Sequence, residues 1–545
     1  MTDTATLFNK TTPAQAAGAR VGSEPPVRRV VVVGGGTAGW MTALLLSNSA
    51  FGPRLQVTVL ESPSVGIIGV GEGSTPWLRG FFEGLGIEES EWMPACNATY
   101  KSGITFDKWS TKPGFERYFH PFASMLDNMT MPQFVDNVHA RQNHAAVHAH
   151  PDRFFMSQHV AVAGRAPRPA HEFPFDLGYG YHFDATLLAA FLRAKALQRG
   201  VVHVARHMNS AMLDERGDIR ALELDGGDSL AADFFVDCSD LASLLIGQAL
   251  KTPYVSFSDV LFNDAAIAMP TPDHDGPLMS QTVSTGLKHG WAWRLPLTSG
   301  NSNGYVYSSA HVSADAAETE LRAHLGLLDA DVPARHLKMR VGRHAKHWNR
   351  NCVAIGLSQG FIEPLEVTTL MFVQRAAASL VDVLERGDLG EAAQAAFNGG
   401  LDARVDGERD YVVAHYKSNS RTDTDYWRAN AANDALSESL QRLLRTWFAS
   451  QPIAPGIENG SFGTGCDTLS WYCLLAGVGL FPEVRQGGAN EAGADLAGID
   501  DLIRRSTPNF PDHRAWLRDI PPHAERVNLW RQPADAGRRV TLGAL

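Results

Sequence analysis

Near its start the chain reads Arg29-Val30-Val31-Val32-Val33-Gly34-Gly35-Gly36-Thr37-Ala38-Gly39. Four consecutive valines predict a buried parallel strand, and the apolar residues that follow predict a helix to about Ser49. Glycines between such a strand and helix allow a tight turn, a close approach to a pyrophosphate, and close packing of the helix on the strand. The helix N-terminus adds positive potential. The expected dinucleotide contacts in this stretch are Gly34, Gly36, Thr37, Ala38 and Gly39.

A second strand, over residues 55–60, ends at Glu61, 22 residues after Gly39. An acidic side chain at this position accepts hydrogen bonds from a ribose in dinucleotide-binding folds. We expect FAD rather than NAD, because the fingerprint opens a long chain and further pieces of a flavin site follow it. These pieces are a glycine-rich loop over residues 66–75 and two later segments, 234–239 and 352–358, which could also be plain core strands. Their expected FAD contacts are Gly69, Val70, Gly71, Asp237, Gly356 and Leu357.

The composition argues against several classes of partner. The 545 residues carry a formal net charge of -11 without clustered Lys or Arg, which disfavours nucleic acid and anionic membranes. Five cysteines without a C-x-x-C pair fit a reducing compartment, and no apolar run reaches the length of about 20 residues that spans a membrane. We expect a cytoplasmic protein with a disordered tail over residues 1–27. His144 and His148 have zinc-ligand spacing, but no further ligand completes a set, so we expect no metal.

Three further blocks contain residues suited to chemistry. The block Gly290-Trp291-Ala292-Trp293-Arg294-Leu295-Pro296 places two indoles on one face if it is extended. The other blocks are Asn97-Ala98-Thr99-Tyr100-Lys101 and Phe361-Ile362-Glu363-Pro364-Leu365-Glu366. Taken alone, the tryptophans fit an ordinary buried strand, Lys101 a surface charge and Glu366 a helix cap. Their presence in one chain favours a functional interpretation.

Together with the glycine fingerprint, these blocks resemble the flavin-dependent halogenases of the tryptophan-halogenase branch, over roughly residues 28–480. The resemblance implies that reduced FAD, oxygen and a halide, chloride or bromide, generate hypohalous acid, which reaches an organic substrate through a tunnel. It also implies that Lys101 and Glu366 are catalytic and that Trp291 and Trp293 separate the flavin from the substrate. An ammonium at Lys101 could polarise hypohalous acid and a neutral amine could form a haloamine, and both mechanisms stay open.

The segment after the third block departs from the family pattern. This chain has Glu366-Val367-Thr368-Thr369 where the family has Glu-Ser-Thr-Gly, so the halide preference stays open. The apolar stretch that follows predicts a helix, whose first backbone N–H groups lack intrahelical partners. We therefore expect the amides of Thr368 and Thr369 to bind the halide.

Three residues are expected to line the substrate pocket. His120 and Phe122 match the family's His-x-Phe, whose rings flank the indole, and Cys466 aligns with a stacking tryptophan. The stretch before Trp471-Tyr472-Cys473 is short and rich in glycine, and groups that would hold an amino acid are not evident. We expect electron-rich indoles or larger indole-bearing molecules as substrates, and free tryptophan as a poor one.

The fold expected from these features is α/β, with a Rossmann-type, monooxygenase-like FAD-binding module fused to a mainly helical substrate-side domain. We place the module at residues 28–390, with an insertion at about 111–180 that contributes to the substrate pocket, and the helical region at 391–545. A single fingerprint implies that a separate NAD(P)H-dependent flavin reductase supplies the reduced FAD, and a homodimer stays open. The alternative activity is that of an FAD-dependent aromatic hydroxylase; a flavin-binding protein without activity is a third reading.

Overall fold

The computed structural model describes residues 27–49, 52–66, 69, 71–170, 173–272, 276–463, 465–484 and 496–520. Apart from Val27, the expected N-terminal tail lies outside these residues, and so does Val70 of the glycine-rich loop. None of the helices in the described part of the chain combines the length and apolar character needed to cross a lipid bilayer.

A six-stranded sheet with the order β20-β21-β12-β1-β2-β8 forms the centre of the cofactor half. Its strand β1 (Arg29–Val33) pairs in parallel with β2 (Gln56–Glu61) and with β12 (Phe234–Asp237). Strand β12 in turn pairs in parallel with β21 (Cys352–Ala354), so both later segments expected from the sequence return to this sheet. The outer strands are β8 (Val202–Ala205) and β20 (Trp348–Asn349).

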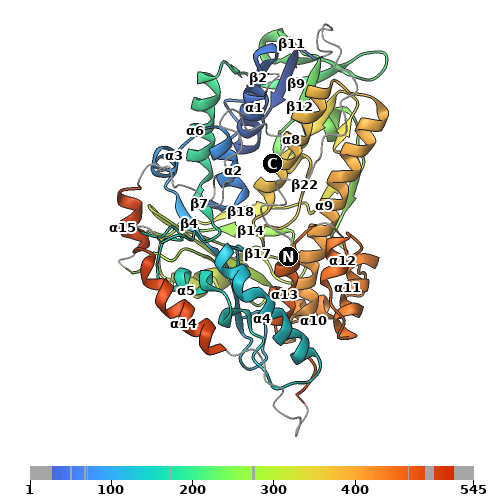
Figure 1. Ribbon diagram of the computed structural model, residues 1–545. Coiled ribbons are helices and arrows are strands. Elements are labelled where there is room, and N and C mark those ends of the chain that lie inside the picture. The colour runs from blue at the N-terminus through green and yellow to red at the C-terminus, as the bar shows by residue number, and fades with distance from the viewer. Residues whose placement is uncertain are drawn as a thin grey trace, which may run out of the picture.

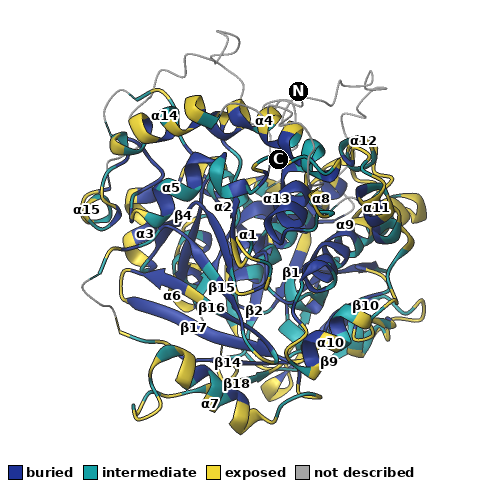
Figure 2. Cartoon of the chain, turned by 90° about the horizontal axis from the view of Figure 1, so that it is seen from below, coloured by how far each residue is buried: buried dark blue, intermediate teal, exposed yellow. Residues whose placement is uncertain are grey.

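Helix α1 (Thr37–Asn48) follows β1 and is buried along most of its length. It is apolar on all sides because α6 (Ala185–Gln198) and α8 (Thr369–Arg386) both pack against it. Figure 1 shows these helices grouped with β2 in the upper half of the molecule, and α1 is almost entirely dark blue in Figure 2. Two shorter helices, α2 (Trp77–Gly84) and α3 (Glu89–Ala95), complete this half.

A seven-stranded sheet with the order β18-β14-β17-β16-β15-β5-β6 forms a second layer. The sequence did not indicate this sheet, because β5 pairs with β15, which lies far along the chain. Strand β17 is buried over its full length (Figure 2). The strands are β5 (Gly103–Asp107), β6 (Arg117–Pro121), β14 (Ala265–Ala268), β15 (Thr282–Gly286), β16 (Gly290–Leu297), β17 (Gly300–Tyr307) and β18 (Arg335–Lys338).

Three small sheets complete the strand topology of the described residues. One of them joins the end of the glycine-rich loop to the strand of Lys101, and consists of β3 (Gly71–Gly73), β7 (Gly180–Asp184) and β4 (Thr99–Lys101). The other two consist of β13 (Tyr254–Ser256), β19 (Gly342–His344) and β22 (Gly360–Phe361), and of β9 (Met208–Leu213), β10 (Ile219–Leu224) and β11 (Ser229–Ala231).

Helices dominate the last part of the chain. In Figure 1, α10 to α13 lie at the lower right, α14 lies at the lower left, and α15 lies above α14 at the left edge. These late helices are α9 (Glu391–Ser418), α10 (Asp425–Ala432), α11 (Glu438–Phe448), α12 (Ala454–Glu458), α13 (Thr468–Gly477), α14 (Leu496–Ser506) and α15 (His513–Arg518). Earlier helices in the lower half and at its edge are α4 (Met125–Gln142), α5 (Met156–Val162) and α7 (Ala314–Leu325).

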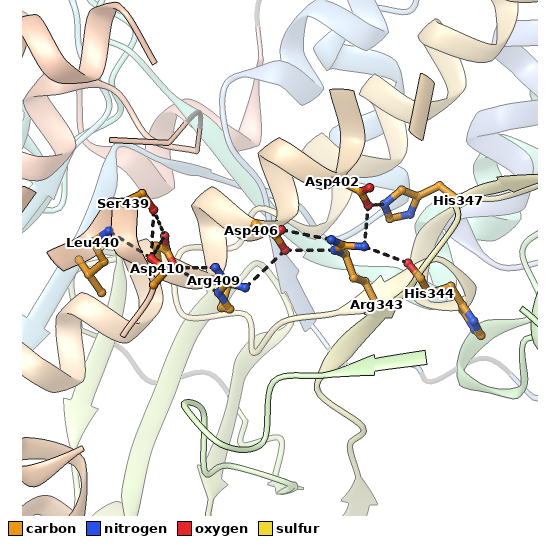
Figure 3. Close-up of polar contacts among 10 residues, drawn as sticks. Arg343, His344, His347, Asp402, Asp406, Arg409, Asp410, Ser439 and Leu440 are labelled. Atoms are coloured by element: carbon orange, nitrogen blue, oxygen red, sulfur yellow. Dashed lines mark hydrogen bonds and ion pairs between the residues drawn. The ribbon is translucent and has the colours of Figure 1, made fainter. Parts of the chain in front are cut away.

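A chain of polar contacts fixes helix α9 to the elements beside it (Figure 3). The guanidinium of Arg343, on β19, lies 2.6 Å from Asp402 and 3.0 Å from Asp406. Two turns of helix are therefore tied to one strand. Further along the helix, the carboxylate of Asp410 accepts hydrogen bonds of 2.5 Å from Ser437 and Ser439, which precede and begin α11. Helix α9 thus joins the small sheet of β19 to the helical region.

Candidate active site

A cavity of about 270 Å³ opens where the parallel sheet, the seven-stranded sheet and helix α8 meet. Its wall includes the start of α1, strand β3 and the segment after β21, which are far apart in the sequence. Ligands of α/β sheets bind at this carboxyl edge of the strands. The predicted cofactor residues that line the cavity are Gly36, Thr37, Ala38, Gly71, Gly356 and Leu357.

The glycine turn has the steric properties that a dinucleotide requires. Gly34 has φ +118°, and a Cβ there would lie 2.1 Å from the carbonyl oxygen of Cys238. A Cβ on Gly39 would lie 1.9 Å from the carbonyl oxygen of Gly34, so only glycine lets α1 pack this closely. At Gly36, by contrast, nothing lies within 4 Å of an added Cβ, which leaves open space for a phosphate group. The turn and the cavity therefore fit FAD.

Several predicted cofactor residues do not line this cavity. Gly34 and Gly39 shape the turn between β1 and α1. Gly69 is exposed. Oε2 of Glu61, at the end of β2, lies 2.9 Å from Nε2 of His203. These positions stay predictions.

Asp237 has a structural role in this fold, and its expected contact with FAD stays a prediction. Its carboxylate is buried and accepts hydrogen bonds from the backbone N–H groups of Ser239, Leu245 and Ile246, at 3.0, 2.7 and 2.8 Å. It is not part of the cavity wall. Asp237 therefore holds the turn after β12 in place.

Two tryptophans stand in the cavity wall. Strand β16 is extended, so Trp291 and Trp293 share one face, and their ring centroids are 6.3 Å apart. Nε1 of Trp291 donates a 2.8 Å hydrogen bond to Glu363, whose carboxylate also accepts from Asn263 and Tyr416 at 2.8 and 2.7 Å. Trp291 is therefore held in a fixed orientation by a buried network.

Lys101 is a fully buried amine. Its Nζ lies 4.9 Å from the ring centroid of Phe122 and has no hydrogen-bond partner among the described residues. Burial lowers the pKa of Lys101 to about 7, although the nearby Glu366 carboxylate opposes this shift. Both the ammonium and the neutral amine are therefore populated near neutral pH.

Glu366 is a buried carboxylate between two imidazoles. Nδ1 of His120 lies 2.9 Å from Oε2, and Nε2 of His415 lies 3.0 Å from Oε1. Burial alone would raise the pKa of Glu366, but the two histidines lower it to about 2. The pKa of His120 is raised, because the effect of Glu366 exceeds that of burial. Glu366 does not cap helix α8, because its two oxygens contact the histidines. The N-cap residue of α8 is Thr368, whose side chain makes no cap bond.

The turn between Glu366 and α8 is unusual. Val367 has φ +54°, a left-handed conformation that is strained for a β-branched residue. Thr369, the first residue of α8, lines the large cavity. Thr368 and Thr369 also line a small adjoining cavity of about 30 Å³, together with Phe361 and Phe372. The amides expected to bind a halide are thus next to the cofactor cavity.

A model of the tryptophan halogenase family matches residues 29–493. The chain belongs to the tryptophan halogenase family. It is 37% identical over 518 residues to the tryptophan 6-halogenase SttH of Streptomyces toxytricini, which covers 89% of this chain and 96% of that protein. It is 33% identical to the tryptophan 7-halogenase RebH of Lentzea aerocolonigenes, over 84% of this chain and 90% of that protein.

Solved structures agree with this assignment. The crystal structure of SttH superposes with a TM-score of 0.78 at 34% identity, over 91% of this chain and 100% of that chain. BrvH, a flavin-dependent halogenase from Brevundimonas sp. BAL3, gives a TM-score of 0.78 at 32% identity, over 91% of this chain and 100% of that chain. The protein is therefore a flavin-dependent halogenase.

On the predicted substrate side of this halogenase, three side chains lie near Lys101 or Glu366. His120 also contacts Ser470, with 2.9 Å between Nε2 and Oγ. The ring of Phe122 lies beside Lys101. Sγ of Cys466 lies 3.7 Å from Oε2 of Glu408, a helix α9 residue. The structure thus brings the predicted catalytic and substrate residues of the halogenase into one neighbourhood.

Sequence reasoning missed several polar residues of this neighbourhood. Helix α9, for which the sequence pattern predicted no chemical role, contributes His415 and Glu408, and both are buried. Glu72 and Asp240 line the cofactor cavity, and burial, followed by the charge of Asp240, raises the pKa of Glu72 to about 7. Of these residues, only Glu72 could have been found from the sequence, because it lies within the glycine-rich loop over residues 66–75 that was predicted to contact FAD.

The strand that carries Lys101 is held by its neighbours. The backbone N–H of Tyr100 donates to Nε2 of His513 at 3.1 Å, and Nδ1 of His513 lies 3.0 Å from the carbonyl oxygen of Leu278. Burial lowers the pKa of His513 to about 4, so the ring is neutral and Nδ1 carries the proton. On the other side, the hydroxyl of Thr99 donates to the carbonyl of Pro296 at 2.6 Å.

We expect His513→Phe to weaken this halogenase without touching its predicted catalytic residues. The change leaves the buried N–H of Tyr100 without an acceptor, which costs about 1–3 kcal/mol of unfolding free energy. Because Lys101 follows Tyr100 directly, kcat should fall by about tenfold while KM for the indole changes little. Urea unfolding and steady-state kinetics measure both effects. His513→Gln, which retains a donor and an acceptor, should lose less, and equal losses in both variants would contradict a positioning role.

Proposed function

We propose that this halogenase uses reduced FAD, oxygen and bromide or chloride to form hypohalous acid, and halogenates an electron-rich indole or an indole-bearing molecule. The observation that carries the proposal is a separation of sites. Trp291 and Trp293 line the cofactor cavity, whereas Lys101 and Glu366 do not. A hydroxylase would have to bring its substrate to the flavin, but here the coupled amine and carboxylate stand apart from the cavity that fits it.

The cofactor would be held by the glycine turn, the start of α1 and the residues after β21. Bound reduced FAD would supply the electrons with which oxygen converts a halide into hypohalous acid. Positive potential at the N-terminus of α1 favours a pyrophosphate near Gly36, where the space is open. At the start of α8, where the first backbone N–H groups of a helix lack intrahelical partners, the amides of Thr368 and Thr369 would bind the halide beside the same cavity.

The chain's own residues would direct the halogen. The Nζ of Lys101 has no other partner in the described structure, so it is available to hydrogen-bond hypohalous acid or to form a haloamine. Glu366 stays ionised over the working pH range because of its two histidines, and it can orient the oxidant and accept the proton that the aromatic ring loses. Trp291, fixed by Glu363, would keep the substrate away from the flavin.

The substrate preference follows from the predicted pocket. Cys466 stands where the family has a stacking tryptophan, so we propose that the pocket offers less aromatic surface to a free amino acid. We propose indoles or larger indole-bearing molecules as substrates and free tryptophan as a poor substrate. A separate NAD(P)H-dependent flavin reductase would supply the reduced cofactor.

Turnover assays test this proposal. Purified protein would be combined with FAD, a flavin reductase, NADH, oxygen and either bromide or chloride, and given indole or free tryptophan. We expect product only when a halide is present, and a kcat/KM for indole that exceeds that for tryptophan by about tenfold or more. Turnover of indole to a hydroxylated product without added halide would favour an aromatic hydroxylase. A preference for free tryptophan would contradict the proposed substrate class.

A further inference from the structure

Helix α9 places one carboxylate between the predicted halide turn and the predicted substrate loop. Oε1 of Glu408 accepts a 2.9 Å hydrogen bond from Oγ1 of Thr368, and Oε2 lies 3.7 Å from Sγ of Cys466. The side chain is only 1% exposed. One oxygen is thus well satisfied by a hydroxyl, while the other has only a weak thiol donor.

The carboxylate of Glu408 has no ion-pair partner within the described part of the chain. No Lys, Arg or His nitrogen there lies within ion-pair distance of its carboxylate, whereas the neighbouring Glu366 has two imidazoles. Burial, and then the charge of Glu366, raise the pKa of Glu408 to about 7, although Thr368, Cys466 and His120 oppose this. A buried carboxylate without a counter-charge is costly, and a cation brought by a ligand would remove that cost.

The carboxylate cannot easily turn away to solvent. The chain of contacts in Figure 3 ties α9 down on both sides of Glu408, at Asp406 and at Asp410. The loop that carries Gly465 and Cys466 packs directly on this turn of the helix, since a Cβ on Gly465 would lie 2.5 Å from the carbonyl carbon of Gly407. Glu408 is therefore held against the loop that carries Cys466.

We propose that Glu408 is a specificity-determining residue that binds a protonated amine on the side chain of the indole substrate. The inference rests on the proposed function, because it assumes that the indole occupies the pocket beside Cys466. Oε2 accepts the N⁺–H bond while Oε1 keeps its bond to Thr368. Indole-ethylamines are favoured by this arrangement, and indoles with a carboxylate side chain are repelled by both Glu408 and Glu366.

Binding of a cation at Glu408 is coupled to a proton. The cation stabilises the ionised carboxylate and lowers its pKa, so below about pH 7 binding must displace a proton from Glu408. Affinity for the amine therefore rises as the pH increases through about 7 and levels off above it. The other titratable groups that face Glu408 are Glu366, which is already ionised, His120, whose pKa is raised, and the Cys466 thiol, whose pKa burial raises.

Calorimetric binding tests the proposal without turnover. We would measure the affinities of tryptamine and indole-3-propionate for the wild type, Glu408→Gln and a control, Glu438→Gln, whose side chain is 94% exposed on α11. In the wild type and the control, at about pH 8, tryptamine should bind at least about tenfold more tightly than indole-3-propionate. At about pH 6, the binding of tryptamine should release a proton. Glu408→Gln should lose both the preference and the proton release.

The outcomes separate this inference from the proposed function. A wild type that binds tryptamine without proton release, or a Glu408→Gln variant that keeps the full preference, would overturn the role of Glu408. The first measurement needs no variant, so it stands even if Glu408→Gln does not fold. Halogenation of indole with no amine preference would refute the inference alone, whereas proton-coupled tryptamine binding without any halogenated product would refute the proposed function alone.

Discussion

Replacement of Lys101 by methionine is expected to reduce halogenated product by at least about a thousandfold while NADH consumption through the reductase continues. The thioether fills a similar volume but can neither hydrogen-bond hypohalous acid as an ammonium nor form a haloamine. Because Lys101 is not part of the cofactor cavity, the reactions of the bound flavin should not depend on it. Product by mass spectrometry and NADH by absorbance, measured in the same reaction, give the two quantities.

Unfolding can be excluded as the cause in this variant. Lys101 is a buried amine whose charged form is disfavoured, so methionine removes a destabilising group and the variant should be at least as stable as the wild type in urea. In the wild type, kcat should change with pH around the Lys101 pKa of about 7. A kcat that rises with pH would indicate that the neutral amine is the active form, and a kcat that falls would indicate the ammonium. Full halogenation by Lys101→Met would contradict the assigned role.

Glu366→Gln is expected to lower kcat by about a hundredfold or more, with a smaller effect on KM. The amide is nearly the same size but carries no charge, so it can neither accept a proton nor offset the two imidazoles. The same change removes the carboxylate that raises the pKa of His120, so that pKa should fall below its wild-type value. Steady-state kinetics and an NMR titration of the histidine test these effects.

The titration of His120 tests its contact with Glu366 separately from the effect of Glu366 on kcat. A loss of kcat without any fall in the pKa of His120 would mean that the contact between His120 and Glu366 is not the source of the shift. Retention of more than about a tenth of wild-type kcat would contradict a direct role for the Glu366 carboxylate. Ser470→Ala, which removes the other contact of His120, leaves the carboxylate in place and should cost less.

Local sequence signals predicted the parts of the fold that depend on near neighbours. The valine run and glycine turn specify β1 and α1, because Gly39 packs against Gly34, and Gly34 packs against Cys238 just after the adjacent strand β12. The spacing of Trp291 and Trp293 placed both rings on one face of β16. Their roles, and those of Lys101 and Glu366, came from resemblance and remain to be tested.

Other features depend on contacts between distant segments, which the sequence pattern does not encode. The seven-stranded sheet pairs β5 (Gly103–Asp107) with β15 (Thr282–Gly286), which are far apart in the sequence, and nothing local marks that partnership. Helix α9 is polar in sequence, so its pattern could not indicate that Glu408 and His415 face inward. Asp237 ends a strand at the expected place, but the direction of its side chain was set by the amides of a later turn.

The central claim is that oxidant formed at the flavin becomes a halogen donor and travels to a separate substrate site. The most direct measurement is the product mass after turnover of indole under isotopically labelled oxygen gas with bromide present. The account predicts an indole that carries the bromine isotope pair and no labelled oxygen. An indole that carries labelled oxygen and no bromine would contradict it, because oxygen would then have passed to the substrate at the flavin itself.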